Sequence, residues 1–278
     1  MRLNALNFAI NRMFASSSGS AVPSLISRLF TPGTAGFCGG MSVTEAFDAG
    51  LMFQDSAGTT PAALEMPVGL VLGQVGSINA SQTTTTKRPT LKDDGSGHLY
   101  LDFDGTDDCF VTPSIDLTGT DKVTVFAGVR TNTDALGMLV EFSENIGLTN
   151  NNFYLASGTD IVTGYNFNTK MPYAFSAACA ATYTIAAPNS SVVAVTSDIA
   201  GSSNTMAVNG VAGTPNSASL GTGNFGNYPA FIGARNDGSK FQFNGRMYTL
   251  PIVVGRAVEP ALIEEVEDAI NASMGGIY

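Results

Sequence analysis

The sequence predicts an all-β sandwich, and three observations lead to this fold class. Short segments in which apolar and polar residues alternate recur from about residue 41 onward, as expected for strands with one buried face. Turn-forming dipeptides such as Asp104-Gly105 and Asn209-Gly210 separate them, because Asp, Asn and Gly tolerate a positive φ. Charged residues make up only 13% of the 278 residues, far fewer than a coiled coil or a long helical array requires.

The strands are expected one after another along the chain. Alternation is clearest from Leu99 to Phe103 and from Val123 to Val129, whereas the run from Leu136 to Phe142 is more continuously apolar. Further strands are expected at residues 191–195, at 206–208, around Phe241 and Phe243, and at 246–254. Turns are expected at Asp237-Gly238 and Asn244-Gly245, and a polar loop or edge segment at 83–86.

One helix is expected to close the chain over residues 260–274. Pro260 suits the first helical position, and Gly275 with Gly276 would end the helix. Apolar side chains fall on one face, and four acidic side chains are expected to face water on the other. These acidic residues are Glu264, Glu265, Glu267 and Asp268.

Residues 1–40 differ from the sandwich at 41–278 and are expected to form an N-terminal docking arm and linker. Apolar residues at spacings of three and four predict two short, amphipathic helical pieces, separated by a Ser/Gly stretch at 16–20. Short helices gain most of their stability from what they pack against, so the arm packs either on its own domain or on a partner. The candidate docking residues are Leu3, Leu6, Ile10, Met13, Phe14, Leu25, Ile26, Leu29 and Phe30.

The charge balance argues against nucleic-acid binding. Thirteen basic and 23 acidic residues give a formal net charge of −10, and a negative surface repels phosphate backbones. No apolar run reaches the ~18 residues that a membrane helix requires. Neither nucleic acid nor insertion into a membrane is therefore expected.

Catalytic residue types are scarce, and no enzymatic activity is expected. His98 is the single histidine, and no nucleophile motif accompanies it. A solvated loop histidine is therefore favoured over a Ser-His-Asp or Cys-His centre. Glycosidases need two carboxylates that face one cleft, whereas Glu141 and Glu144, three positions apart, fall on opposite faces of an ideal strand.

An acidic segment at residues 102–108 offers weak calcium ligands. Calcium favours oxygen-rich loops, but the residue order of an EF-hand is missing. The favoured alternative is that these side chains cap a tight turn through its backbone, so no cofactor is expected and calcium stays a weak candidate. The carboxylates are those of Asp102, Asp104, Asp107 and Asp108.

Aromatic side chains in the middle of the chain are candidates for contact with sugars. Exposed aromatic rings on loops can stack on sugar rings, although most are expected to fill the core. The absence of Trp weakens the prediction of sugar binding. The possible glycan contacts are Tyr154, Tyr165, Tyr173, Phe225 and Tyr228.

The three cysteines, Cys38, Cys109 and Cys179, form no CxxC pair, and their number is odd. A disulfide framework and a zinc site are therefore not expected. Buried free thiols are the favoured interpretation, and a single bridge between two of the three stays open.

Three stretches together resemble the laminin-G-like, concanavalin-A-like jelly roll. They are residues 99–108 (LYLDFDGTDD), residues 206–210 (MAVNG), and the segment from Phe231-Ile232-Gly233 to Tyr248, which a strand and the closing helix follow. The resemblance covers roughly residues 90 to 274. It implies a jelly-roll sandwich, to which the expected partly helical N-terminal arm and the one C-terminal helix are added.

A second resemblance is to domains of tailed-phage virion proteins, and it rests on residues 51–61 followed by residues 67–72. It implies a structural protein of the bacteriophage particle exterior: a tail, tail-fibre or capsid-decoration component. Such a protein would join other virion proteins through its arm, as a homo-oligomer or part of a large assembly, and would display the sandwich for adhesion to a host surface. The alternative is a carbohydrate-binding module for receptor recognition. A glycan-cleaving enzyme is a third interpretation, but the paired acidic motif of catalytic relatives is missing.

Overall fold

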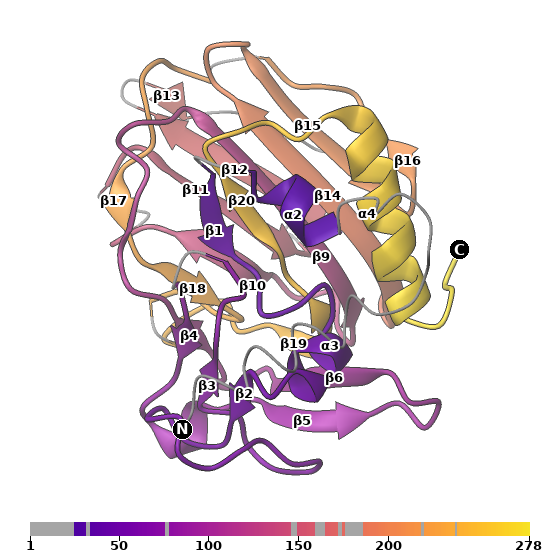
Figure 1. Cartoon of the computed structure of the whole chain (residues 1–278). Coiled ribbons are helices and arrows are strands. Elements are labelled where there is room, and N and C mark those ends of the chain that lie inside the picture. The colour runs from indigo at the N-terminus through magenta and orange to yellow at the C-terminus, as the bar shows by residue number, and fades with distance from the viewer. Residues whose placement is uncertain are drawn as a thin grey trace.

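Two antiparallel sheets packed face to face form the protein, as the computed structural model shows (Figure 1). The structure describes residues 25–31, 34–75, 78–145, 149–158, 165–171, 174–175, 186–217, 220–236 and 238–278. Sheet A runs in the order β16 (Val211–Ala212), β15 (Ser203–Val208), β14 (Asn189–Asp198), β9 (Lys122–Thr131), β19 (Asn244–Thr249), β6 (Leu99–Asp104) and β5 (Thr90–Asp93). Also in sheet A, β20 (Ile252–Val254) pairs with β9 and with β1 (Ala35–Phe37).

Within the described residues, each sheet has nine strands. The second is sheet B. Its order is β13 (Ala174–Phe175), β12 (Tyr165–Met171), β11 (Asn152–Ser157), β10 (Gly137–Phe142), β18 (Ala230–Ile232), β7 (Phe110–Val111), β4 (Ala80–Ser81), β3 (Leu70–Val71) and β2 (Met52–Phe53). A separate two-stranded piece joins β8 (Ile115–Asp116) to β17 (Asn227–Tyr228). The predicted all-β fold class is therefore confirmed.

The main apolar core lies between the two sheets, and strand alternation decides which side chains enter it. On β9, Val123, Val125 and Val129 face this core, whereas Phe126 faces away from sheet B. The outward face of sheet A is therefore apolar too, since side chains alternate between the two faces of a strand. That second apolar face must be covered by something other than sheet B.

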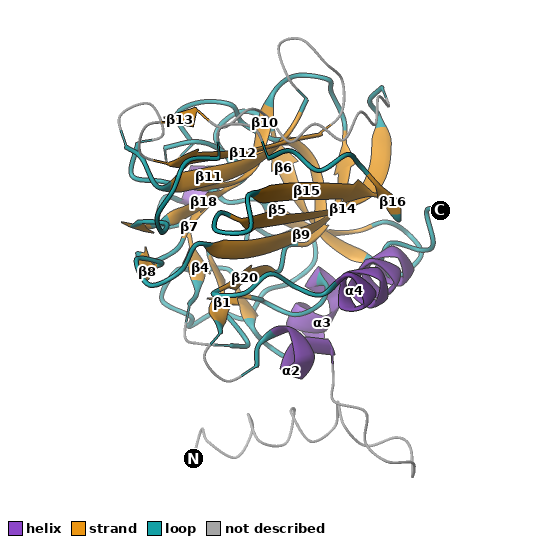
Figure 2. Ribbon diagram, turned by 90° about the horizontal axis from the view of Figure 1, so that it is seen from above, coloured by secondary structure: helices purple, strands orange, loops and turns teal. Residues whose placement is uncertain are grey.

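Helices cover this outward face of sheet A. Figure 2 shows α2 (Leu25–Leu29) and α4 (Pro260–Ser273) along this side of the sandwich, whereas α3 (Val43–Asp48) packs on the main core. Helix α4 places Val266 and Ile270 against Phe126 of β9. The helix approaches the strand closely, because a Cβ added to Gly128 would lie 2.6 Å from Cγ2 of Ile270.

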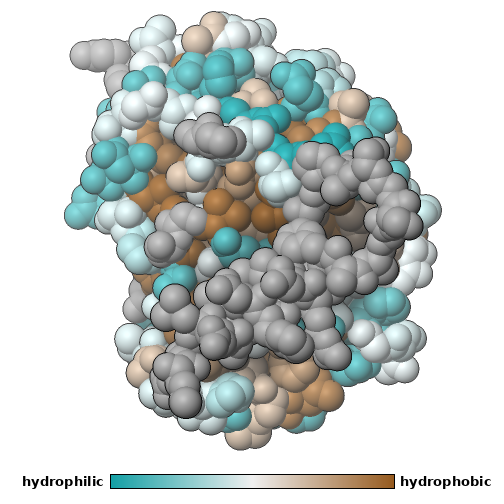
Figure 3. Space-filling model, viewed as in Figure 1, coloured by the Kyte–Doolittle hydropathy of each residue, from teal (hydrophilic) through white to brown (hydrophobic). Residues whose placement is uncertain are grey.

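The second half of the predicted docking arm packs on its own domain. Leu29 and Phe30 are buried in the layer beneath α4, so the interpretation of these two as partner-docking residues is wrong, and Leu25 and Ile26 are half-buried against the same layer. Figure 3 shows apolar groups in the middle of this helical face. Residues 35–37, expected to belong to the linker, form β1 instead. The other candidate docking residues, Leu3, Leu6, Ile10, Met13 and Phe14, lie outside the described residues.

Residues 42–90 build a cap at one end of the sandwich. Helix α3 begins with a capping box, in which Ser42 accepts the N–H of Glu45 and Glu45 accepts the N–H of Met41. The guanidinium of Arg88 then ties the loops together, because it donates to the carbonyls of Gln82, Thr83 and Gln54 at 2.9 to 3.1 Å. Part of the predicted polar loop at 83–86 is a 3-10 helix, η1 (Thr85–Lys87).

Two late features of the chain differ from the sequence prediction. Asn244-Gly245 opens β19 and forms no turn, because a Cβ at Gly245 would lie 2.2 Å from the carbonyl oxygen of Arg130 on β9. Glycine is needed there for the close approach of two strands. Phe241 and Phe243 lie in a loop before β19, and the expected strand at 246–254 is divided into β19 and β20.

Other local predictions are confirmed. Asn209-Gly210 forms the turn between β15 and β16, with φ of 52° and 72°. Pro260 begins α4, and Gly275 and Gly276 follow its end with φ of 86° and 74°. One acidic residue of α4, Glu267, is buried, which contradicts the prediction that it faces water.

Candidate functional site

A buried ion pair lies on the face of sheet B that is turned away from sheet A. The carboxylate of Glu141 on β10 points to this face, because Val140 and Phe142 on either side of it enter the core. Glu141 has no solvent-exposed surface, and Nε of Arg235 donates a hydrogen bond to it. Ser143 donates a second hydrogen bond at 2.8 Å. Each oxygen of this buried carboxylate thus has a hydrogen-bond donor in place of water.

Two aromatic rings enclose the guanidinium of Arg235. Its central carbon lies 5.7 Å from the ring centroid of Tyr154 and 4.6 Å from that of Phe241. Tyr154 is the cross-strand neighbour of Glu141 on β11, so the ion pair and the ring share one face. Both distances are within the range of cation–π attraction.

A short loop between β18 and β19 holds Arg235 and Phe241 over β10. Phe241 accepts the N–H of Met138 through its carbonyl oxygen, and Gly233 donates to the carbonyl of Leu139. Phe241 has a φ of 51°, a conformation that costs a bulky side chain energy and that clusters at functional sites. The loop is therefore fixed at both ends, with a strained aromatic residue placed on the guanidinium.

The same face carries a buried amide with an open acceptor. Asn152 lies two positions before Tyr154 on β11, so its side chain is on the same face, and it has no exposed surface. Its nitrogen donates to the carbonyl of Thr149 at 2.7 Å, whereas its oxygen has no hydrogen-bond partner. Stacking surfaces, a guanidinium and an amide oxygen together suit a polar ligand that contains a ring.

The structure separates the five aromatic residues that were predicted as glycan contacts. Tyr154 lies at the site, and Tyr173 is outside the described residues. Tyr165 faces the core, where its hydroxyl donates to Oδ1 of Asn189 at 3.3 Å and burial raises its pKa to about 12. Phe225 is buried, and Tyr228 packs on the core with its hydroxyl bonded to the carbonyl of Asn150. The prediction is therefore wrong for Tyr165 and Phe225, which face the core and not a loop surface.

Sequence reasoning missed Arg235 and Phe241. The ion pair joins residues that are 94 positions apart, and no local pattern connects them. Glu141 was considered only as half of a catalytic pair with Glu144. One available signal was that a charged residue lies in the middle of an otherwise apolar strand, at residues 137–142.

The acidic segment brings three of the four candidate calcium ligands together. Ligand oxygens of Asp104, Asp107 and Asp108 all lie within 4.8 Å of one another, whereas Asp102 is paired with Lys92 at 2.7 Å. Asp104 accepts the N–H of Thr106, and Asp108 accepts the N–H of Asp104, as in a capped turn. Burial and the neighbouring carboxylates raise the pKa of Asp108 to about 6.

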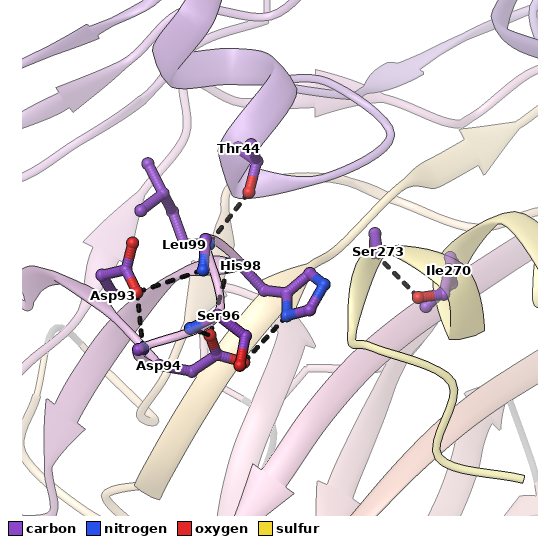
Figure 4. Close-up of polar contacts among 10 residues, drawn as sticks. Thr44, Asp93, Asp94, Ser96, His98, Leu99, Ile270 and Ser273 are labelled. Carbon is purple, nitrogen blue, oxygen red and sulfur yellow. Dashed lines mark hydrogen bonds and ion pairs between the residues drawn. The ribbon is translucent and has the colours of Figure 1, made fainter.

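His98 belongs to a structural turn. Its Nδ1 lies 3.0 Å from Oδ2 of Asp94, and Oδ1 of Asp94 accepts the backbone N–H of Ser96 (Figure 4). The imidazole packs against the end of α4, because a Cβ at Gly275 would lie 3.0 Å from its Cε1. Ser273, on the neighbouring helix in Figure 4, donates its hydroxyl to the carbonyl of Ile270 at 2.8 Å. The histidine is half-buried and paired, where a solvated loop histidine was expected.

Three further features lie apart from the candidate site. Cys38 and Cys109 are buried and form no disulfide, as predicted, and Cys179 is outside the described residues.

An apolar cavity of about 40 Å³ lies beneath α3, lined by Val43, Ala46 and Met52 among other residues. Within the described part of the chain, no helix is both long and apolar enough to cross a membrane.

Comparison with known proteins shows the fold alone. No protein-family model matches the sequence, and no curated protein matches it. The structure is similar to the sialidase of Trypanosoma rangeli, with a TM-score of 0.54 and 12% identity over 99% of this chain and 39% of the sialidase. The chain thus spans about two fifths of that enzyme.

Two smaller solved domains are similar at lower TM-scores. One is domain 4 of a GH43 extracellular arabinanase from Geobacillus stearothermophilus in complex with arabinotriose, with a TM-score of 0.47 and 14% identity over 64% of this chain and 81% of that domain. The other is the CBM40 of a Ruminococcus gnavus sialidase bound to α2,3 sialyllactose. It has a TM-score of 0.43 and 13% identity over 56% of this chain and 97% of that domain. The fold is a concanavalin-A-like jelly-roll β-sandwich, and the resemblance to phage domains rests on sequence motifs alone.

Proposed function

We propose that the chain is a non-catalytic glycan-binding module that a phage particle displays, with its ligand face on the outer side of sheet B. One observation carries this proposal: a guanidinium fixed by a buried carboxylate lies between two aromatic rings on the outer face of sheet B. Aromatic rings stack on the apolar faces of sugars, and fixed donors and acceptors bond their hydroxyls.

Binding without catalysis is consistent with how the acidic groups are engaged. Glu141 is buried and both of its oxygens are engaged, by Arg235 and by Ser143, so it does not face a cleft as a catalytic carboxylate must. His98 is bonded to Asp94 in a turn at the opposite sheet. The described residues therefore favour recognition over hydrolysis.

The proposed ligand face and helix α2 lie on opposite sides of the sandwich. Residues 1–24 lead into α2, which packs on α4 over the outer face of sheet A, whereas Tyr154 and Arg235 lie on the outer face of sheet B. An anchor at the chain start would thus leave the ligand face directed away from the particle. The placement of α2 and the proposed ligand face on opposite sides supports a display role.

A glycan array with the full chain tests the proposed binding. We expect binding to at least one class of glycan, and a loss of at least about tenfold in affinity for Tyr154→Ala, because the stacking surface is removed. Tyr228→Phe serves as the matched control, since its ring belongs to the core margin, and it should bind like the wild type. No bound glycan, or equal binding by Tyr154→Ala, would contradict the proposed binding.

Deletion of residues 2–24 tests the proposed display role separately. This deletion keeps α2 and β1, which are part of the domain, and removes the segment that carries the first predicted amphipathic stripe. We expect a folded protein that binds the same glycans but is no longer incorporated into particles. Normal incorporation of the shortened chain would contradict the role of the arm.

A further inference from the structure

Four acidic residues of α4 were expected to face water, and Glu267 is the one of these four that is buried. Its side chain is 3% exposed, and one of its oxygens accepts the backbone N–H of Gly210 in the turn between β15 and β16. The other oxygen, Oε1, is buried and has no hydrogen-bond partner. An ionised carboxylate would carry a charge and an unmet acceptor there, and an apolar surrounding disfavours both.

The same carboxyl group lies where three segments meet. The ring of Tyr278 lies against the turn, since a Cβ at Gly210 would be 3.5 Å from its Cε2. Asn271 of α4 ties the chain end back, because it accepts the N–H of Ile277 at 2.7 Å and donates to the carbonyl of Tyr278 at 3.0 Å. Figures 1 and 2 both place the C-terminus near β16. Helix, hairpin and chain end therefore share one contact.

Among the described residues, the titratable groups that act on Glu267 are two carboxyl groups and a phenol. Asp268 and Glu264 act on it from its own helix, and the phenol of Tyr278 faces it from the chain end, while the turn contributes its backbone. Burial, then these two carboxylates, raise the pKa of Glu267 to about 7. Burial raises the pKa of Tyr278 to about 12, so its hydroxyl stays protonated near neutral pH.

We propose that Glu267 is a proton-controlled latch that holds the β15–β16 hairpin and the C-terminal residues on α4. The neutral carboxyl accepts from Gly210 without a buried charge, and the three segments stay packed. Ionisation places an uncompensated charge beside two carboxylates in a buried contact, so the hairpin and the chain end open more often. The latch thus tightens in mildly acidic surroundings and loosens above neutral pH.

Hydrogen exchange on the full chain at pH 6 and pH 8.5, corrected for intrinsic rates, tests the latch. We expect protection at Gly210 and Ile277 to fall on the order of tenfold from pH 6 to pH 8.5, because the raised pKa lies between the two values. Glu267→Gln should keep equal protection at both pH values. Glu259→Gln, where the exposed side chain makes no capping hydrogen bond at the start of α4, should behave like the wild type.

Equal protection of the wild type at both pH values, or the same pH dependence in Glu267→Gln, would overturn the latch. Should Glu267→Gln fail to fold, the carboxyl carbon of Glu267 can be titrated by NMR in the wild-type chain. A midpoint near 7 supports the latch, and a midpoint below 5 overturns it.

Discussion

Arg235 donates a hydrogen bond to the fully buried carboxylate of Glu141, and this pair joins the loop before β19 to the middle of β10. Most ion pairs in proteins are exposed and contribute little. Here the carboxylate is out of water, and the guanidinium is only 16% exposed and stacked on rings. The pair thus links the stability of sheet B to the geometry of the proposed ligand face.

Removal of one partner of this pair should be far more harmful than removal of both. We expect Arg235→Ala to lower the free energy of unfolding by about 3–5 kcal/mol, because Glu141 would stay buried without a cation. The double variant Glu141→Leu/Arg235→Met should regain most of that loss. Urea unfolding measures both. The exposed pair Arg28–Glu265 supplies the control: Arg28→Ala should change stability little, and an equal loss there would contradict the explanation.

The close packing of helix α4 on sheet A should depend on Gly128, the single glycine of β9. A Cβ at Gly128 would lie 2.6 Å from Cγ2 of Ile270 and 2.8 Å from Sδ of Met274. We expect Gly128→Ala to cost about 1–3 kcal/mol, because the helix must shift outward or its side chains must repack. Gly119→Ala, where no atom lies within 4 Å of the added Cβ, should be neutral in the same thermal-unfolding assay. Equal stabilities of the two variants would show that α4 does not pack this closely.

Arg88 should not be replaceable by lysine. Its guanidinium serves three carbonyl oxygens in different directions, and an ammonium group on a flexible stem does not reproduce this fork. We expect Arg88→Lys to lower the free energy of unfolding by about 1–3 kcal/mol and to increase proteolysis of the cap at 42–90. Thr85→Ala, an exposed change in η1, is the control. If proteolysis of Arg88→Lys were unchanged, interactions other than the three hydrogen bonds of Arg88 would hold the cap together.

The sequence predicts features that depend on local pattern. Alternation identifies β6 and β9, because each has one face in the core between the sheets. Pro260 and the glycines after Met274 mark the limits of α4, since they act through their own backbone. These features need no knowledge of the neighbouring strand or helix.

Features that depend on distant contacts were not predictable. Gly245 suits a turn by type, yet it lies in β19 because the carbonyl of Arg130 leaves no room for a side chain. Tyr165 resembles a surface tyrosine until the register of β12 turns it into the core. The pair of Glu141 and Arg235 exists only once β10 and the loop before β19 meet. The candidate site is therefore largely a product of tertiary packing.

Asp108 should make the protein less stable as the pH rises through 6. Its pKa in the folded protein is about 6, above the ordinary value for aspartate, so folding favours its protonated form. The resulting stability is fully present below the ordinary aspartate pKa of ~3.9 and is lost as pH rises through 6. Asp108→Asn keeps an oxygen to accept the N–H of Asp104, and it should raise stability at pH 7.5 by about 1–2 kcal/mol in the presence of EDTA.

The advantage of Asp108→Asn should disappear near pH 4, because the wild-type carboxyl is then protonated as well. Thermal unfolding between pH 4 and pH 8 measures the difference. Asp116→Asn should act in the opposite direction at neutral pH, because hydrogen bonds from Thr118 lower the pKa of that exposed carboxyl and favour its charge. If Asp108→Asn were instead less stable than the wild type at pH 7.5, the charged form of Asp108 would be the one that the turn stabilises. A loss of stability that appears only when calcium replaces EDTA would assign that preference to a bound cation.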